Sequence, residues 1–193
     1  MEHHIPIVLA RILVVGILVS SVNVGTRAAV RTKTYRNTAD RYSFSYPAAW
    51  QVGNFSRADM SGIPLMAALA TSGSIVGPSD GALVSFQVWV ARRATDNATL
   101  RSVVDWILHH PYPVSGSAKD DAATINGVQY LRATGTVSVD AEKIKTVFGE
   151  SCLGTSRGSL TYYLKSIYFT RPQAATSQDK AKLAEVLASF RLT

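Results

Sequence analysis

Hydrophobic and polar positions alternate in several stretches of this 193-residue chain, and a period of two residues is typical of half-buried β-strands. The most regular stretch is residues 82–91, which read ALVSFQVWVA. Four of its apolar side chains would share one face of the strand: Val84, Phe86, Val88 and Val90. Because Trp89 falls on the opposite face, we expect that face to be partly covered as well, in a sheet with helices on both sides.

Two segments show the 3.6-residue period of amphipathic helices instead. Residues 98–109 place apolar side chains at positions i, i+3, i+4, i+7 and i+8, and either Asn97 or Thr99 can serve as the N-cap. Residues 176–190 form the second segment, in which Thr176 begins a sequence that resembles a capping box. We therefore expect two helices that lie far apart in the chain.

Further strands are predicted in the second half of the chain. Asn126-Gly127 is the favoured two-residue turn of a hairpin, since both positions tolerate a positive φ. The expected strands are residues 123–125, 128–135, 137–139, 143–148 and 160–170. Residues 149–158 contain several glycines and serines, and we interpret them as a connection between strands.

The most patterned part of the chain is residues 35–52. Aromatic and hydroxyl residues alternate from Tyr42 to Tyr46, and Pro47 ends that strand because proline has no N–H to give to a ladder. A second short strand begins at Trp50. We interpret the two strands as a β-hairpin at the edge of a sheet, with its aromatic side chains in the core.

Residues 53–81 are rich in glycine, serine and proline and contain an apolar, helix-compatible island at residues 63–70. This island either packs on the sheet or forms a flap, with Met60 and Met66 over a pocket. The whole chain then has six or seven strands, mostly in hairpin succession, and two helices. That order predicts an α+β domain, in which helices pack on an antiparallel sheet.

The N-terminus carries a separate apolar segment. Residues 5–24 are nearly continuous apolar sequence, interrupted by Arg11, and the run from Ile12 to Val19 has the length of a signal-peptide core. Residues 1–29 are therefore predicted to be a signal peptide or an uncleaved membrane anchor, and both interpretations stay open. A buried helix of a cytosolic protein is the third and least favoured interpretation. Residues 30–193 form the predicted domain, which we place outside the cytoplasm.

Composition and charge narrow the class of partner. An apolar content of 47% with 17% charged residues fits a globular protein. The net charge is +7, but the basic residues are scattered along the chain. A dispersed surplus predicts a solvated surface or a preference for an acidic protein or an anionic membrane, and export argues against nucleic acid.

Seven residues in the patterned region resemble the opening of the PsbP-like family: Tyr35, Asn37, Tyr42, Phe44, Tyr46, Pro47 and Trp50. The order of the later elements extends the resemblance over residues 35–192. It implies the α/β/α sandwich that PsbP shares with Mog1, and a non-enzymatic accessory role, since PsbP is an extrinsic subunit of photosystem II. The chain departs from plant PsbP in its short N-terminal region and at residues 53–81, so no photosystem role is carried over.

Two motifs suggest nucleophilic chemistry. Gly154–Gly158 matches the G-x-S-x-G elbow around Ser156, but that elbow needs a helix directly after the serine and a strand is predicted here. We interpret the motif as a hairpin turn. Cys152 could pair with His109 or His110, although a lone cysteine is typical of a small buried hydrophobe. No enzymatic activity is therefore expected.

Three residue sets could ligate a metal ion: His109 and His110 with Asp105, Asp120 with Asp121, and Asp140 with Glu142. Each has too few ligands for a metal site of known type, so we expect no metal and no cofactor. Sequons at Asn54 and Asn97 matter only in a eukaryotic secretory pathway.

Four basic residues are predicted to lie on neighbouring strands: Arg132, Lys143, Lys145 and Lys165. Arg132 and Lys165 fall on central strands, where an unpaired charge is costly, so we expect them to reach solvent or a partner. They either form a binding stripe for an acidic or membrane-bound protein or belong to a solvated rim.

The sequence thus favours a non-enzymatic, exported accessory domain that binds a protein partner at a membrane or envelope surface. The alternative is a carrier of a small molecule or lipid, with an apolar pocket under residues 60–70. A third hypothesis, from another class, is a serine hydrolase that uses Ser156.

Overall fold

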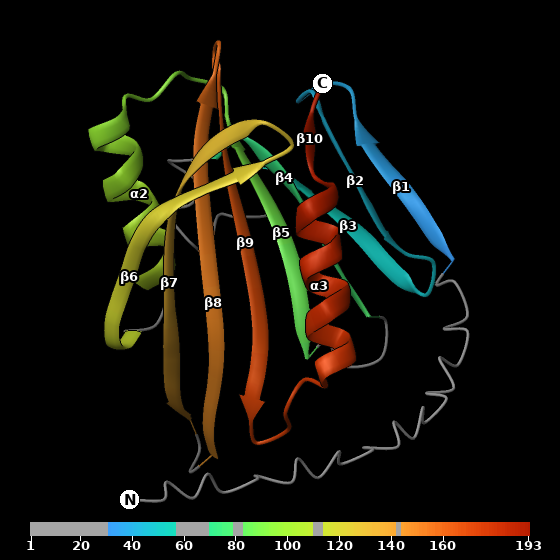
Figure 1. The fold of residues 1–193 in the computed structure, drawn as a ribbon, viewed down its shortest axis with the longest axis vertical. Coiled ribbons are helices and arrows are strands. Elements are labelled where there is room, and N and C mark those ends of the chain that lie inside the picture. The colour runs from blue at the N-terminus through green and yellow to red at the C-terminus, as the bar shows by residue number, and fades with distance from the viewer. Residues whose placement is uncertain (1–30, 57–69, 79–82, 110–113, 142–143) are drawn as a thin grey trace, which may run out of the picture.

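The computed structural model describes residues 31–56, 70–78, 83–109, 114–141 and 144–193. Within these ranges the chain forms ten strands and two helices (Figure 1). The strands are β1 (Thr32–Asn37), β2 (Tyr42–Pro47), β3 (Trp50–Ser56), β4 (Ser72–Pro78), β5 (Val84–Ala91), β6 (Val114–Ile125), β7 (Val128–Ala141), β8 (Ile144–Arg157), β9 (Leu160–Arg171) and β10 (Arg191–Leu192). The helices are α2 (Asn97–His109) and α3 (Ser177–Ser189).

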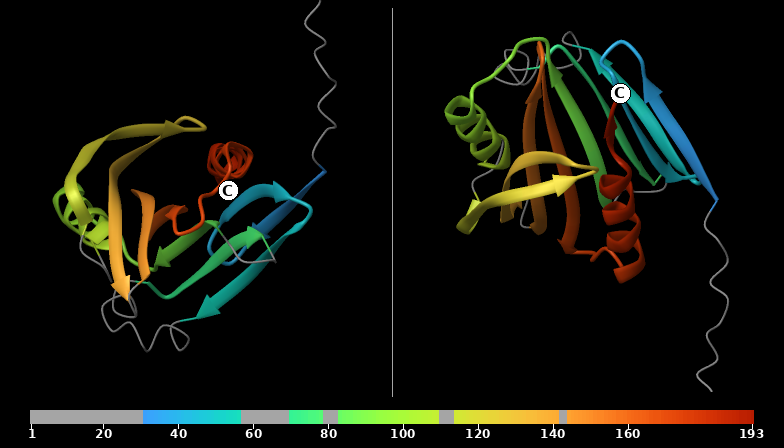
Figure 2. Two further views of the ribbon diagram at one scale, coloured as in Figure 1. Left: turned by 90° about the horizontal axis from the view of Figure 1, so that it is seen from below. Right: turned by 45° about the horizontal axis from the view of Figure 1, so that its top comes forward.

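The strands form one large and one small antiparallel sheet. The large sheet has seven strands in the order β3-β4-β5-β9-β8-β7-β6, and the small one has three in the order β1-β2-β10. The large sheet curves around α3, while α2 lies on its outer side (Figure 2). This arrangement confirms the predicted α+β architecture, with helices on both faces of an antiparallel sheet.

The main core fills the concave side of the large sheet. Its largest buried side chains are aromatic and come from the small sheet, from the large sheet and from the end of α3: Tyr42, Phe44, Trp50, Phe86, Tyr130, Tyr162 and Phe190. Ser189 fixes α3 to β2, because its Oγ donates to Ser45 O at 3.1 Å and accepts from Ser45 N at 2.8 Å. The small sheet and α3 therefore cover this face together.

A second, smaller core lies between α2 and the outer face. It contains the apolar side of α2 together with Ala133, Cys152 and Tyr163 from the sheet. Trp89 is half-buried on this face, and its ring lies 4.6 Å from that of Phe55. The prediction that the outer face is partly covered is therefore confirmed.

The predicted hairpin at residues 42–52 is wrong. β2 pairs with β1 and β10 in the small sheet, whereas β3 is the edge strand of the large sheet and pairs with β4. The turn after Pro47 therefore carries the chain from one sheet to the other. Alternation of apolar and polar residues shows that a strand is half-buried, not which strand it pairs with, so this pairing could not be predicted.

Two predicted loops contain strands. Residues 149–158 lie almost entirely in β8, and β4 falls within residues 53–81. The glycines responsible are sites of close packing, not turns. A Cβ on Gly154 would lie 2.4 Å from Val104 of α2, and one on Gly73 would lie 2.2 Å from the Phe55 ring. Of the island at residues 63–70, only Ala70 lies within the described residues, and it is buried.

Two local signals, the Asn-Gly turn and the capping box of α3, are confirmed, whereas the predicted cap of α2 is wrong. Asn126 and Gly127 have φ values of 47° and 78°, as a two-residue hairpin turn requires. Thr176 and Asp179 form the capping box of α3. The N-cap of α2 is neither Asn97 nor Thr99, because Asp96 Oδ1 accepts from the backbone N–H groups of residues 98 and 99 at 3.0 Å.

Substitution of Gly154 should test the close approach of α2. We expect Gly154→Ala to destabilise the domain by about 1–3 kcal/mol, because the new methyl group overlaps Val104 and Leu100. Gly53→Ala is the matched control, since its Cβ would meet only Ile75, at 3.4 Å. Urea unfolding measures both free energies. Equal effects at the two positions would contradict this explanation.

Candidate functional site

A polar turn connects β1 and β2 of the small sheet, and its residues also contact the large sheet. Asn37 Oδ1 accepts from Asp40 N at 2.9 Å, and Asn37 Nδ2 donates to Asp40 Oδ2 at 3.0 Å. The chain then reverses at Arg41, whose φ is 57°. These contacts place the Asp40 carboxylate inside the protein, where the residue is 2% exposed.

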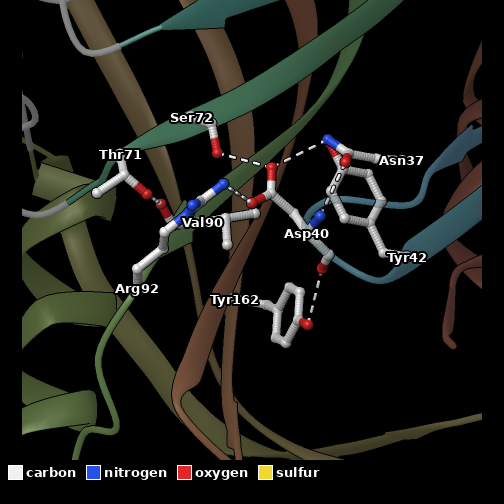
Figure 3. A network of polar contacts seen from close by, with 8 residues as sticks. All are labelled: Asn37, Asp40, Tyr42, Thr71, Ser72, Val90, Arg92 and Tyr162. Carbon is white, nitrogen blue, oxygen red and sulfur yellow. Dashed lines mark hydrogen bonds and ion pairs between the residues drawn. The ribbon is translucent and has the colours of Figure 1, made fainter.

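Groups from three strands of the large sheet reach this turn (Figure 3). Ser72 Oγ, at the start of β4, donates to Asp40 Oδ2 at 2.7 Å. Arg92, directly after β5, lies with Nη2 3.4 Å from Asp40 Oδ1. Tyr162 of β9 donates its hydroxyl to Asp40 O at 2.9 Å. A single buried residue therefore ties the small sheet to the large one.

Tyr42 extends the same network into the core. Its hydroxyl donates to Ser74 Oγ at 3.1 Å and accepts from Asn37 Nδ2 at 3.4 Å. Burial raises the pKa of this hydroxyl, which therefore stays neutral and acts as a structural hydrogen-bonding group. Sequence reasoning missed Asp40, although an asparagine three residues before an aspartate, followed by a strand, is a signal of such a turn.

A buried ion pair lies under α2. Lys165 Nζ is 3.1 Å from Glu150 Oε1, and the two side chains are only 8% and 4% exposed. Lys165 Nζ also donates to Ile107 O, in the last turn of α2, at 3.3 Å. Burial raises the pKa of Glu150, and the nearby ammonium opposes that rise. The expectation that Lys165 reaches solvent is wrong, because it finds its carboxylate inside the protein.

Cys152 lies beside this pair, in register with Lys165 on the neighbouring strand. The thiol is fully buried, and burial raises its pKa to about 12. A thiol of this kind is not nucleophilic at neutral pH. The side chains of His109 and His110, its predicted partners, lie outside the described residues.

Ser156 belongs to a hairpin and not to a nucleophile elbow. It sits near the end of β8, and the chain turns at Gly158, with φ 59°, directly into β9. Its Oγ accepts from Thr95 N at 3.1 Å and lies 3.1 Å from Thr161 Oγ1. Only the last residue of the motif, Gly158, lies in the predicted turn, because Gly154 to Arg157 belong to β8. Ser156 holds the loop before α2 against the sheet.

Of the predicted basic stripe, only Arg132 has a described side chain that reaches solvent. Its Nε donates to Asp121 Oδ1 at 2.6 Å, and its Nη2 contacts the second oxygen of the same carboxylate. Lys143 and the side chain of Lys145 lie outside the described residues. Lys165 is therefore not part of this stripe, and a binding role of Arg132, Lys143 and Lys145 stays a prediction.

Other predicted sites fall partly outside the described residues. Among the described side chains, no group of three histidines, cysteines or acids could hold a metal ion. Five candidate ligands lie beyond those side chains, namely His109, His110, Asp120, Asp140 and Glu142, as does most of the proposed pocket under residues 60–70. The alternative of a carrier protein therefore stays a prediction.

Solved structures show the same architecture. Over 88% of its length the chain resembles 96% of cyanobacterial PsbP from Synechocystis sp. PCC 6803, with a TM-score of 0.51 and 13% identity. The chain has the Mog1/PsbP-like fold. It also resembles a protein from Bacteroides thetaiotaomicron, with a TM-score of 0.51 and 11% identity; 83% of this chain is covered but only 48% of that protein, so the chain spans about half of it.

A third similar structure is the Ran-binding protein Mog1p of Saccharomyces cerevisiae, with a TM-score of 0.45 and 11% identity over 85% of this chain and 96% of that one. No family model matches the sequence, and no curated protein matches it.

The residues that carry the resemblance are structural in this Mog1/PsbP-like domain. Tyr42, Phe44 and Trp50 are buried in the main core, and Tyr35 packs against it while donating its hydroxyl to Asn54 Oδ1 at 2.7 Å. Asn37 belongs to the polar turn. No helix within the described ranges is long and apolar enough to span a membrane, and the predicted signal or anchor at residues 1–29 lies outside those ranges.

Removing the Asp40 carboxylate should weaken the contact between the two sheets and so lower the free energy of unfolding. We expect Asp40→Ala to cost about 2–3 kcal/mol of stability, because Ser72 and Asn37 lose their common acceptor. Arg92→Ala should cost less than about 1 kcal/mol, since that side chain is 59% exposed. Thermal and urea unfolding report both values. A larger loss for Arg92→Ala would show that the ion pair dominates the turn.

Removing one member of the buried ion pair should destabilise the protein more than replacing both members with apolar residues. We expect Lys165→Met to lose about 3 kcal/mol or more at neutral pH, since Glu150 then stays buried without its cation. Glu150→Leu together with Lys165→Met should be more stable than either single variant, because no charge remains buried. Urea unfolding of the four proteins gives the coupling free energy.

The same variant has a predicted pH dependence. Because burial raises the pKa of Glu150 and Lys165 lowers it, Lys165→Met removes the opposing influence and raises that pKa further. A raised carboxyl pKa in the folded state stabilises the fold at low pH, and this contribution is lost as the pH rises. The deficit of Lys165→Met should therefore shrink on acidification. A deficit independent of pH would contradict a buried charge as its cause.

Proposed function

We propose that this protein is a non-enzymatic, exported accessory domain that binds a protein partner at a membrane or envelope surface. One observation carries the proposal: the described side chains best suited to chemistry are engaged inside the fold. Cys152 is fully buried with a raised pKa, Ser156 is bonded to a neighbouring loop, and Glu150 is paired with Lys165 under α2.

The fold supports the same proposal. Cyanobacterial PsbP is similar over nearly its whole length. The sequence resembles the PsbP-like family, in which PsbP itself is an extrinsic subunit and several bacterial members are exported. The apolar segment at residues 5–24 is of the kind that would deliver or anchor such a domain.

The proposal can be tested by crosslinking in the host that encodes the protein. A tagged full-length chain should be recovered in the envelope fraction. A photo-crosslinking amino acid is placed at exposed positions, first at Arg36 and then at Gln178. We expect a discrete adduct with one protein, formed from positions in one region of the surface only. Mass spectrometry identifies the adduct.

Two results would overturn the proposal. The first is recovery of the chain in the cytoplasmic fraction with no envelope pool. The second is labelling by a fluorophosphonate probe that disappears in Ser156→Ala while the variant unfolds like the wild type. The second result would revive the hydrolase hypothesis.

A further inference from the structure

Three arginines, Arg92, Arg93 and Arg157, lie at one end of the large sheet, and Arg41 lies in the polar turn that contacts this end. We call the surface formed by these four residues the arginine end. β5 and β8 are both antiparallel to β9, so they run toward the same end of the sheet. In Figure 1 this end is uppermost, and the tip of the β8–β9 hairpin and the loop that leads to α2 lie there. All four residues are exposed.

Contacts between neighbouring elements fix these four residues near one another. Arg92 pairs with Asp40, which precedes Arg41 in the polar turn. The backbone oxygen of Arg93 accepts from Thr161 Oγ1 at 2.7 Å. Arg157 closes the β8–β9 hairpin opposite Leu160, one residue before Thr161. Arg41 and Arg157 are both close enough to Tyr162 to lower the pKa of its hydroxyl against the effect of burial.

Little negative charge offsets these guanidinium groups among the described residues nearby. Asp40 is buried, and its carboxylate is already shared by Asn37, Ser72 and Arg92. Asp96 is exposed and accepts from the first turn of α2 and the Thr99 hydroxyl, so it is the one exposed carboxylate of these two beside four guanidinium groups. The arginine end therefore presents a positive surface, on rigid strand ends and tight turns.

We propose that the arginine end is the surface that binds the partner, and that it takes an acidic segment of a protein. This inference rests on the proposed function and names the surface through which it acts. All four cations are arginines, whose planar guanidinium groups bind carboxylates in bidentate fashion and which are enriched at protein interfaces where lysine is depleted.

The position of this surface favours a protein over a lipid headgroup. β1 runs from Thr32 toward the Asp40 turn, so residues 1–30 join the domain at the end of β1 away from the arginines (Figure 1). A domain held to a membrane through that segment would direct the arginine end away from the bilayer. The predicted binding stripe at Arg132, Lys143 and Lys145 is a different set of residues.

Binding of a defined acidic peptide tests the inference. The probe is a fluorescent peptide of about 15 residues rich in glutamate, with glutamine replacing glutamate in the reference peptide. Fluorescence anisotropy should show that Arg93→Glu with Arg157→Glu weakens binding of the acidic peptide at least about tenfold. Arg92 is left intact because it contributes to the polar turn.

The matched control is Arg31→Glu with Lys33→Glu, which changes the net charge equally at the opposite end of β1, where both side chains are exposed. It should bind the acidic peptide about as well as the wild type. Equal losses in the two double variants would mean that net charge alone attracts the peptide, and that result overturns the inference. So does a lack of binding by the wild type. Circular dichroism melts confirm that each variant is folded.

Vesicles of phosphatidylcholine with phosphatidylglycerol test whether the arginine end binds anionic lipid headgroups instead of an acidic protein segment. The arginine-end variant should bind them as the wild type does. If it loses vesicle binding and keeps peptide binding, the surface serves a membrane and the inference is overturned. Crosslinked adducts that form in the host only at other positions would refute this surface while leaving the proposed accessory function intact.

Discussion

The arrangement of this domain depends on one buried carboxylate. Asp40 lies in the turn between the first two strands, yet its acceptors are filled by Ser72 and Arg92 of the large sheet as well as by Asn37. An unpaired buried carboxylate would be expensive, so this turn is favourable only when the large sheet supplies these donors. The turn is therefore a joint between two sheets that share no strand.

The aromatic core follows from this joint. Once the small sheet is held against the large one, Tyr42 and Phe44 face Phe86 and Tyr162 across the concave side, and Phe190 at the end of α3 completes the layer. The ring centroids of Phe44 and Phe86 are 5.4 Å apart, with their planes at 81°. Edge-to-face contacts of this kind favour one relative position of the two sheets, because the rings fit poorly if either sheet slides.

Local physics made much of this fold predictable from the sequence, but long-range pairing did not. The turn at Asn126-Gly127 and the cap at Thr176 depend on residues near them in the chain, so their sequence signals are sufficient. The partner of β2 depends on a distant segment, and Gly154 is small because α2 packs on it, not because the chain turns there. Lys165 was misplaced for the same reason: its carboxylate is on the neighbouring strand.

The charged side chains of this structure fall into two classes, buried and exposed, and the two classes have different roles. Inside, Lys165 and Asp40 each have a specific partner, because the low dielectric of the interior makes an unmatched charge costly. At the exposed ends of β5 and β8, arginines accumulate without nearby free carboxylates among the described residues, and water makes that arrangement inexpensive. A cluster that folding does not need, on a rigid support that folding provides, is the feature through which an accessory domain can recognise a partner.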